Sequence, residues 1–249
     1  MTESVPLGIM DRSVPSGSHV CAFYSGTAGR DEVVLPFLAE GLRTGHKCLA
    51  VLDSTSPGEV LAKLYDRGVD ADQAAQAGQI EVETPANAYF RSGTFSTDDI
   101  LTFWGQGISK AKDSGMFAFL RATGEMPSVL NHPDGRTEFF RFEAMLNQFS
   151  SPLPLVVLCL YDLDGMGAEV LMQALRTHPA VIVDGMIHEN PYYIEPSRFL
   201  ARIGWTTLRW VVKNSPCPER SRGISPGGPV SPSARTRRSR RRADPPRAW

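Results

Sequence analysis

The chain has 249 residues and a net charge of −1, and 42% of its residues are hydrophobic, which suits one domain with a sizeable core. It contains no apolar run of about 18 residues, which excludes a membrane-spanning helix, and the acidic N-terminus without a long apolar segment excludes a secretory signal. The scattered cysteines have no zinc-ligand spacing, so we expect reduced thiols in a cytoplasmic protein. They are Cys21, Cys48, Cys159 and Cys217.

The first 42 residues predict an arm followed by the opening strand and helix of the domain. Residues 1–17 contain two prolines and two glycines, so we expect an arm with little fixed structure. Residues 18–42 then predict a buried strand, a turn of small residues and an amphipathic helix whose Arg30 and Asp31 face solvent. The apolar face of this helix comprises Val34, Phe37, Leu38 and Leu42.

The turn at residues 25–29 stands where an α/β nucleotide-binding protein carries its phosphate loop. Such a loop needs G-x-x-x-x-G-K-[ST], because its Lys reaches the terminal phosphates and its hydroxyl holds Mg²⁺. Here Gly26 and Gly29 are too close together, and Arg30-Asp31 stands where Lys-Ser/Thr would be. The Asp31 carboxylate would also repel a phosphate at the start of the helix. The order of elements is typical of an NTPase, whereas the chemistry argues against one.

Strands and helices alternate from there to about residue 200. This alternation, with strands that are continuous apolar runs, predicts a three-layer α/β fold with a mostly parallel sheet and helices on both faces. Ser56 and Glu59 predict a capping box at the start of one helix. The further strands are expected at residues 47–52, 79–84, 116–120, 155–161 and 180–183, and the main further helices at 56–68, 96–111, 135–149 and 167–176.

Polar residues stand at the carboxyl ends of these predicted strands. Because the ends of parallel strands meet at one edge of a sheet, we expect the polar residues to converge on a mostly hydrophobic pocket with a few orienting groups. Glu125 is the leading candidate for ligand contact, and the alternative is a structural carboxylate paired with Arg121 or the backbone. Tyr161 and Asp162 could instead cap a strand end. The candidate ligand-binding residues are Tyr24, Ser25, Asp53, Thr123, Glu125, Tyr161 and Asp162.

Four further residues are secondary candidates for ligand contact: His19, Arg121, His178 and Asn190. His19 opens its strand at the edge opposite the strand ends, which favours a structural histidine. His178 precedes Pro179 between a helix and a strand, which favours a turn residue or helix C-cap. No H-x-x-x-H or comparable spacing supports a metal site, and no Ser/His/Asp or Cys/His arrangement supports nucleophilic catalysis. We therefore expect no catalytic residue, no metal and no cofactor.

The composition changes abruptly near the C-terminus. From residue 213 onward there are ten Lys and Arg against two acidic residues. Residues 214–249 contain seven prolines, three glycines and six serines. This composition leaves too few apolar side chains for their burial to offset the entropy lost on ordering the chain. We expect a disordered tail over 213–249, whose arginines at 235–242 could contact nucleic acid through phosphates. A solvated tail without a partner, or an end produced by truncation or a shifted reading frame, is the alternative.

Several motifs in order give a family resemblance over about residues 18–200. The sequence resembles the MEDS sensory domain, named after methanogens, methylotrophs and a dichloromethane-responsive repressor. The motifs are His19-x-Cys21-x-x-Tyr24, Pro36-Phe37-Leu38-Ala39-Glu40-Gly41-Leu42, Arg121-x-Thr123-Gly124-Glu125-Met126, Cys159-x-Tyr161-Asp162, His178-Pro179 and Glu189-Asn190-Pro191-Tyr192-Tyr193.

The resemblance implies a RecA-like core, similar to circadian-clock ATPases, that lacks the phosphate loop. It also implies sensing of small hydrocarbon-derived ligands, in proteins that often add a DNA-binding, histidine-kinase or anti-sigma-type module. The sequence after residue 200 does not resemble such a module, so we expect either that the chain acts through a partner or that it is a piece of a longer regulator.

These observations predict a non-catalytic cytoplasmic sensory domain at residues 18–212 that binds a small molecule and signals to a regulatory partner of the kinase or anti-sigma type. Two alternatives remain. One is a divergent RecA-like ATPase that uses Arg30 in place of the lysine. The other is a protein that associates with nucleic acid through its basic tail. No membrane partner is expected.

Overall fold

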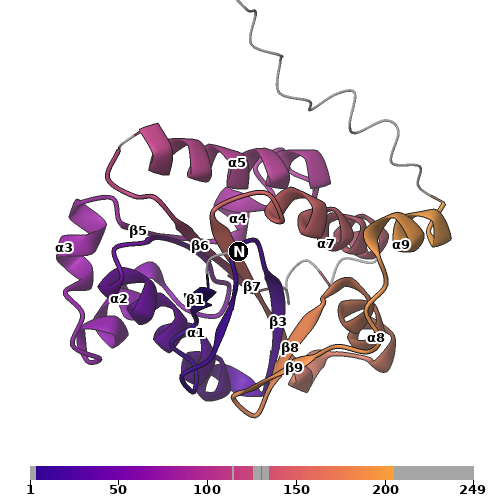
Figure 1. Ribbon diagram of the computed structural model, residues 1–249, viewed down its shortest axis with the longest axis horizontal. Helices are drawn as coiled ribbons and strands as arrows, with labels where there is room; N and C mark the ends of the chain where they lie inside the picture. Colours follow the sequence, from indigo (N-terminus) through magenta and orange to yellow (C-terminus); the bar gives the residue numbers. More distant parts are fainter. Residues whose placement is uncertain (1–3, 114, 126–129, 131–134, 205–249) are drawn as a thin grey trace, which may run out of the picture. The chain divides into compact units, whose positions relative to one another are not determined.

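The computed structural model describes residues 4–113, 115–125, 130 and 135–204, all within one compact unit, Met1–Arg209. Its centre is a seven-stranded sheet in the order β5-β4-β6-β7-β3-β8-β9 (Figure 1). Neighbouring strands run parallel except at the β8–β9 edge, which is antiparallel. The predicted three-layer α/β fold with a mostly parallel sheet is therefore confirmed. The predicted tail at 213–249 lies outside the described residues.

The strands of the described residues are β1 (Ser4–Pro6), β2 (Ser13–Pro15), β3 (His19–Tyr24), β4 (Lys47–Val51), β5 (Ile80–Glu83), β6 (Leu120–Glu125), β7 (Leu155–Asp162), β8 (Ala180–Val183) and β9 (Met186–Glu189). The helices are α1 (Gly26–Arg43), α2 (Pro57–Tyr65), α3 (Ala71–Gln76), α4 (Pro85–Ala88), α5 (Thr97–Asp113), α7 (Arg136–Ser150), α8 (Ala168–Thr177) and α9 (Pro196–Arg202), with a short 3₁₀ turn, η2 (Leu163–Gly165).

The direction in which the chain moves through the sheet decides which face each helix covers. From β3 the chain steps to β4 and β5 in one direction, and from β5 it returns through β6 and β7 to β8. Because crossovers between parallel strands are right-handed, the reversal puts the two sets of helices on opposite faces. Helices α1, α2 and α3 pack on one face, whereas α7 packs against β3 and β7 and against α5, α8 and α9 (Figure 1).

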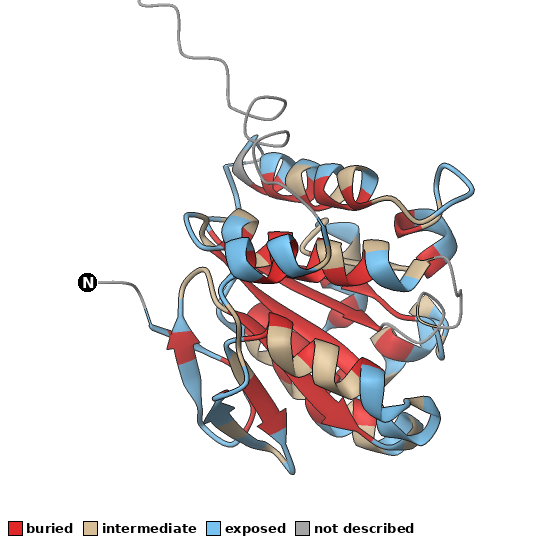
Figure 2. Cartoon of the chain, turned by 90° about the vertical axis from the view of Figure 1, so that its right-hand side faces the viewer, coloured by how far each residue is buried: buried red, intermediate tan, exposed pale blue. Residues whose placement is uncertain are grey.

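The central strands are buried on both faces, as their apolar sequences require. All residues of β3, β4 and β6 are buried, and Figure 2 shows the sheet as buried between helices whose outer residues are exposed. In the parallel pair β3–β7, Cys21 lies opposite Cys159. Side chains at these two positions therefore share a face, the one that α7 covers.

The expectation of an unstructured arm is wrong for residues 4–15, which form the antiparallel hairpin β1–β2. Alternate apolar residues explain this, since Val5, Leu7 and Ile9 are buried in the core with the α1 face of the sheet. Gly8 is in the left-handed region, and a Cβ there would lie 2.4 Å from the carbonyl oxygen of Pro36. The hairpin can therefore pack this closely on α1 only with glycine at position 8.

Two strand predictions also need correction. The fourth strand was expected at 116–120, but β6 begins at Leu120 and continues to Glu125. Met116 and Ala118 are exposed, so only Phe119 and Leu120 of the predicted stretch are buried. Strand β9 was not predicted, because its residues are mostly exposed at the sheet edge and lack an apolar pattern. The capping box of Ser56 and Glu59 is confirmed.

Candidate functional site

The carboxylate of Glu125 lies at the end of β6, 1% exposed. Its Oε2 accepts the backbone N–H groups of Asp53 at 2.6 Å and Ser54 at 3.0 Å. Its Oε1 accepts the hydroxyl groups of Ser54 at 2.7 Å and Tyr24 at 3.1 Å, and lies 3.5 Å from the Arg30 guanidinium. These donors come from the ends of β3 and β4 and from α1. Glu125 therefore connects three elements, and its partner is Arg30 with backbone N–H groups.

Arg30 is the buried cation of this network. Its guanidinium donates to Asp31 Oδ1 at 2.7 and 3.0 Å and bonds the Ser54 hydroxyl. Asp31 in turn accepts Lys63 Nζ at 2.7 Å. Burial opposes ionisation of Asp31, but hydrogen bonds from Lys63 and Arg30 lower the pKa of this carboxyl. The prediction that Arg30 faces solvent is wrong, because its charge is needed inside to compensate Glu125.

The predicted turn of small residues is mostly helical, since α1 begins at Gly26. The Gly26 N–H donates to Asp162 Oδ1 at 3.3 Å, and the same oxygen accepts the N–H of Asp164 at 3.0 Å, which caps η2. Ser25 is the exposed N-cap residue of α1, and its side chain makes no capping hydrogen bond. Asp162 is therefore bonded to backbone amides at the position where the sequence predicted a ligand contact or a cap.

Two of the predicted strand-end residues lie away from the Glu125 network. Thr123 is fully buried, and its hydroxyl donates to the carbonyl of Leu158 at 2.8 Å. Tyr161 lies on the face of the sheet that α7 covers, where its hydroxyl donates to Glu143 Oε1 at 3.0 Å. The structure thus brings together Tyr24, the backbone of Asp53 and Glu125, whereas Tyr161 belongs to a second polar cluster.

This second cluster lies between β3, β7 and the helices α7 and α8. The Nε2 atoms of His19 and His178 each lie 3.1 Å from Glu143 Oε2. Cys159 Sγ lies 3.2 Å from His19 Nε2 and 3.7 Å from Glu143 Oε2. One ligand atom from each of these four residues lies within 4.8 Å of the other three, and all four residues are buried. We call these residues the His-Cys-Glu cluster.

Burial and mutual proximity set the ionisation of the His-Cys-Glu cluster. Burial, together with the neighbouring His178, lowers the pKa of His19 to about 4. Burial would raise the pKa of Glu143, but His178 and His19 hold it well below its usual range. Burial raises the pKa of the Cys159 thiol. A carboxylate beside a neutral imidazole and a neutral thiol is therefore the state that these residues favour.

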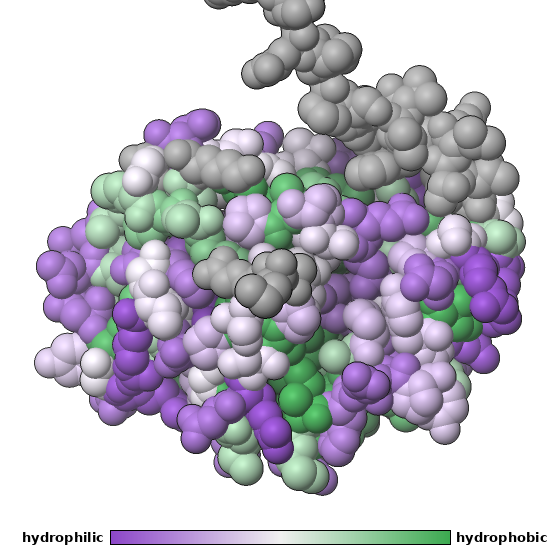
Figure 3. Space-filling view, in the orientation of Figure 1, coloured by the Kyte–Doolittle hydropathy of each residue, from purple (hydrophilic) through white to green (hydrophobic). Residues whose placement is uncertain are grey.

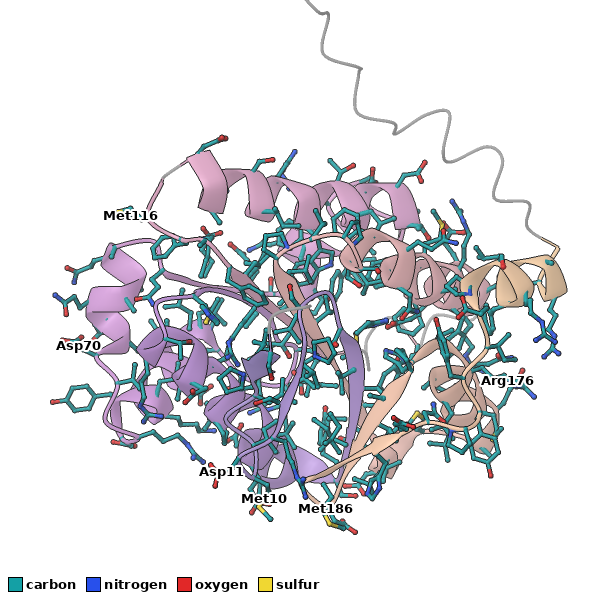
Figure 4. All side chains as sticks on the ribbon, in the orientation of Figure 1. Met10, Asp11, Asp70, Met116, Arg176 and Met186 are labelled. Atoms are coloured by element: carbon teal, nitrogen blue, oxygen red, sulfur yellow. The ribbon has the colours of Figure 1, made fainter. Side chains whose placement is uncertain are left out.

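A cavity of about 610 Å³ lies beside the end of β3, on the side of the hairpin. It is lined by Gly8–Met10 of the hairpin, by Phe23–Ser25, by α1, by Leu163 and by Val183–Gly185 of the β8–β9 turn. Figure 3 shows an apolar area on this face, above the place where Figure 4 labels Met10 and Met186. Met10 reaches the β8–β9 turn, where its Cγ would lie 3.4 Å from a Cβ at position 185.

Residues 18–179 match the MEDS family, described as MEthanogen/methylotroph, DcmR Sensory domain. The match covers more than half of the chain. This chain belongs to the MEDS family. The β3, β6 and β7 strands and the His-Cys-Glu cluster all lie within the matched residues, whereas the hairpin precedes the MEDS match.

Among curated proteins, the MEDS domain is similar to the transcriptional repressor DcmR of Methylorubrum extorquens. The two are 28% identical over 163 residues, which cover 64% of this chain and 57% of the relative. The chain thus spans little more than half the length of that relative. The likeness supports a regulatory role.

Among solved structures, the MEDS domain is similar to a KaiC-like protein, PH0186, of Pyrococcus horikoshii OT3. The TM-score is 0.55 at 14% identity, over 73% of this chain and 80% of that chain. This likeness concerns the fold and bears out the predicted RecA-like, KaiC-like core. In the described part of the MEDS chain, no helix has the length and apolar character needed to cross a bilayer.

The secondary candidates of the MEDS domain have protein partners. Arg121 does not pair with Glu125. Its guanidinium donates to the carbonyl of Phe37 at 3.2 Å, to the carbonyls of Pro6 and Leu7 in the hairpin and to His46 Nδ1 at 3.1 Å. It passes under Gly41 of α1, where a Cβ would lie 2.4 Å from its Cδ.

The other secondary candidates organise the end of α8. His178 is the C-cap residue of α8, as predicted, and its Nδ1 lies 2.8 Å from the carbonyl of Ala174. Asn190 donates to the carbonyl of His178 at 2.8 Å. These contacts hold the His178 ring in place beside Glu143.

Sequence reasoning missed the hairpin and one residue of the MEDS domain, Glu143. The hairpin was missed because its prolines and glycines outweighed the alternation of Val5, Leu7 and Ile9. Glu143 was missed although it interrupts the apolar face of α7, between Phe139 and Leu146 at helical spacing. A carboxylate on a buried helix face needs a partner, so that interruption was a usable signal.

Proposed function

We propose that this MEDS domain is a non-catalytic sensor that binds a small, weakly polar organic molecule in the cavity beside β3. The observation that carries this proposal is the cavity itself. Its volume of about 610 Å³ is within the usual range for small-molecule sites. Its walls include Ile9, Phe23 and Val33, and Tyr24 and Glu32 are among its lining residues with polar side-chain groups.

Exposed apolar side chains around the cavity support this proposal. Met10 is 67% exposed, Leu163 43% and Val183 38%. They come from the hairpin, from η2 and from the β8–β9 turn, three segments that are distant in sequence. A ligand that touched all three would remove their apolar surface from water, at about 25 cal/mol per Å². It would also fix the hairpin against the β8–β9 turn, which a partner could recognise.

The position of the cavity in the sheet supports ligand binding too. Strands β3 and β7 are neighbours, but the chain leaves β3 into α1 on one face and leaves β7 toward α8 on the other. Ligands of open α/β sheets bind at such switch points, outside the carboxyl ends of the strands. Tyr24 and Leu163 stand there and line the cavity.

We further propose that the domain does not hydrolyse nucleotides. Arg30, which occupies the place of the missing lysine, is paired with Asp31 and with Glu125. A nucleotide phosphate would have to break these buried ion pairs, and removing one partner from such a pair costs several kcal/mol. Calorimetry with Mg²⁺ and ATP should therefore give no binding heat. Binding that the Glu125→Gln variant abolishes would instead support the divergent ATPase.

The output of the domain is also a proposal. DcmR is a transcriptional repressor, and this chain matches 57% of its length. We infer that ligand binding here controls transcription, through a DNA-binding or kinase or anti-sigma-type partner. Contact with nucleic acid through the basic residues at 235–242 is the alternative route. Salt-dependent DNA binding that survives deletion of residues 214–249 would rule that route out.

A thermal-shift panel tests the ligand proposal. Short-chain alcohols and halogenated methanes should raise the Tm of the full chain in a concentration-dependent way, by mass action. Val183→Trp places an indole at the exposed rim of the cavity. It should raise the ligand concentration needed for a given Tm shift at least tenfold. Met116→Trp is the matched control, because Met116 is also exposed and Figure 4 shows it far from Met10 and Met186. Equal shifts in the two variants would contradict the proposed cavity.

A further inference from the structure

We propose that the His-Cys-Glu cluster is a binding site for one divalent transition-metal ion of the zinc class. The donors are His19 Nε2, His178 Nε2, Cys159 Sγ and Glu143 Oε2, which come from β3, the end of α8, β7 and α7. Two imidazoles, a thiolate and a carboxylate are a donor set that Zn²⁺ and its neighbours in the first transition row accept. Among the described residues, no other group of this kind comes together.

The distances between the donor atoms fit a four-coordinate ion. Zinc bonds of about 2.0–2.3 Å in a tetrahedron place neighbouring ligand atoms roughly 3.3–3.8 Å apart. Here each Nε2 lies 3.1 Å from Glu143 Oε2, and the sulfur lies 3.2 Å from His19 Nε2 and 3.7 Å from Glu143 Oε2. Four of the six pairs of donor atoms are therefore at nearly the required spacing, and all six pairs lie within 4.8 Å.

Hydrogen bonds at the Nδ1 atoms of His178 and His19 orient the two rings so that their Nε2 atoms face the space between the four donors. The Nδ1 of His178 lies 2.8 Å from the carbonyl oxygen of Ala174, which can only accept, so Nδ1 carries a proton. The Nδ1 of His19 lies 3.3 Å from Asn147 Oδ1. Metal-binding histidines carry such partners on their second nitrogen.

The orientation of the Asn147 amide is fixed independently of His19. Its Nδ2 donates to the carbonyl oxygens of Glu143 at 3.2 Å and Thr177 at 2.7 Å. Oδ1 must therefore be the atom that faces His19, and His19 carries its proton on Nδ1. When the two rings are neutral, both Nε2 atoms then present lone pairs to Glu143 Oε2, and each contact becomes attractive when a proton or a metal ion lies between nitrogen and oxygen.

One donor atom of the His-Cys-Glu cluster makes no hydrogen bond. His178 Nε2 is a buried nitrogen without a hydrogen-bond partner, although Glu143 Oε2 lies 3.1 Å away. The other Glu143 oxygen, Oε1, accepts the Tyr161 hydroxyl at 3.0 Å. Tyr161 thereby leaves Oε2 as the oxygen available to a metal ion.

The charges balance when an ion binds. A divalent ion with the Cys159 thiolate and the Glu143 carboxylate forms a neutral centre, and the Cys159 proton leaves to solvent as the Cys159 sulfur binds the metal. Four protein donors in a buried site leave no open position for substrate, which is typical of structural rather than catalytic zinc. The ion would join α7 and α8 to the sheet.

Cobalt substitution tests the site on the full-length chain. After removal of metal with dipicolinate, one equivalent of Co²⁺ should give a thiolate-to-cobalt charge-transfer band and the intense visible bands of four-coordinate cobalt, and Zn²⁺ should abolish both. Elemental analysis of protein purified without chelator should find about one zinc per chain. Absence of cobalt bands in wild-type protein that is folded by circular dichroism would overturn the proposal.

Two matched cysteine variants assign the sulfur donor. Cys21 and Cys159 are both buried and lie opposite each other in the β3–β7 pair, but Cys21 donates to the carbonyl of Ala180 and is not in the cluster. Cys159→Ser should lose the charge-transfer band, whereas Cys21→Ser should keep it. The reverse result would disprove the assignment, and the wild-type spectrum decides the existence of the site even if a variant fails to fold.

Discussion

The two faces of the central sheet each bury a glutamate, but they compensate its charge differently. On the α1 face, Glu125 has Arg30 within 3.5 Å and accepts hydrogen bonds from two hydroxyls and two backbone amides. On the α7 face, Glu143 faces two histidines and a thiol, with Tyr161 as its hydroxyl donor.

This difference separates a structural carboxylate from one that is suited to bind an ion. An arginine keeps its charge under all conditions in proteins, so the Glu125 network is complete without a ligand. Histidine binds metals as the neutral imidazole, and cysteine gives up its proton when a metal binds. Glu143 therefore lies among groups that can accept a cation from outside, whereas Glu125 already has its cation.

Removal of the Arg30 charge should have the largest effect. Arg30→Met leaves Glu125 buried without its cation, and we expect a loss of about 3–5 kcal/mol in the free energy of unfolding by urea denaturation. The double variant with Glu125→Gln should recover part of this loss, because the amide still accepts hydrogen bonds without carrying charge. Lys63→Met, which removes a more exposed partner of Asp31, should cost less than about 1 kcal/mol. Equal losses for Arg30→Met and Lys63→Met would contradict the comparison.

Metal should stabilise the α7 face by a smaller, concentration-dependent amount. With free Zn²⁺ at a hundred times its Kd, we expect wild-type protein to gain about 2.7 kcal/mol over the apo form. Calorimetric unfolding over a series of buffered zinc concentrations measures this gain. Cys159→Ser should gain much less, and a gain of the same size in that variant would show that zinc acts elsewhere.

The fold was largely predictable from the sequence, because a parallel strand that is buried on both faces consists of consecutive apolar residues. Strands β3, β4 and β7 were located within a residue. The partners of buried charges could not be found in this way. Arg30 was placed in solvent because helical spacing describes which face a residue is on, but not which distant strand end it reaches.

The candidate site was predictable only where residues stand at strand ends. Tyr24 and Glu125 were placed together correctly, since the register of parallel strands brings their ends to one edge. The His-Cys-Glu cluster escaped prediction because successive donors are separated by 16 to 124 positions along the chain. Motif spacing detects only sites in which two donors share a turn or a helix.

Two tyrosines, one beside each buried glutamate, allow the two faces of the sheet to be compared through smaller losses in unfolding free energy. Tyr24 and Tyr161 donate to Glu125 at 3.1 Å and to Glu143 at 3.0 Å. Tyr161→Phe should cost about 1.5–2 kcal/mol in apo protein, as expected for a hydrogen bond to a charged group. Tyr24→Phe should cost about half as much, because Ser54 donates to the same oxygen of Glu125. Urea denaturation of both variants at neutral pH checks the order, and a larger loss for Tyr24→Phe would reverse the comparison.

Arg121 is a third buried charged residue, and its hydrogen-bond partner His46 can gain a proton as the pH falls. His46 accepts the Nε–H of Arg121 at 3.1 Å, and burial together with this guanidinium lowers the pKa of His46 from 6.5 to about 4. Between these two values the unfolded chain binds a proton that the folded chain does not, so stability is full above pH 6.5 and falls as the pH drops toward 4. For this half-buried ring we expect a loss of about 1 kcal/mol at roughly pH 5.5. His46→Gln offers an amide oxygen to Arg121 without titrating, and His19 contributes equally to both proteins. The difference in unfolding free energy between wild type and variant should therefore change by that amount from pH 7 to about 5.5. Parallel stability curves over this range would show that Arg121 does not act on His46.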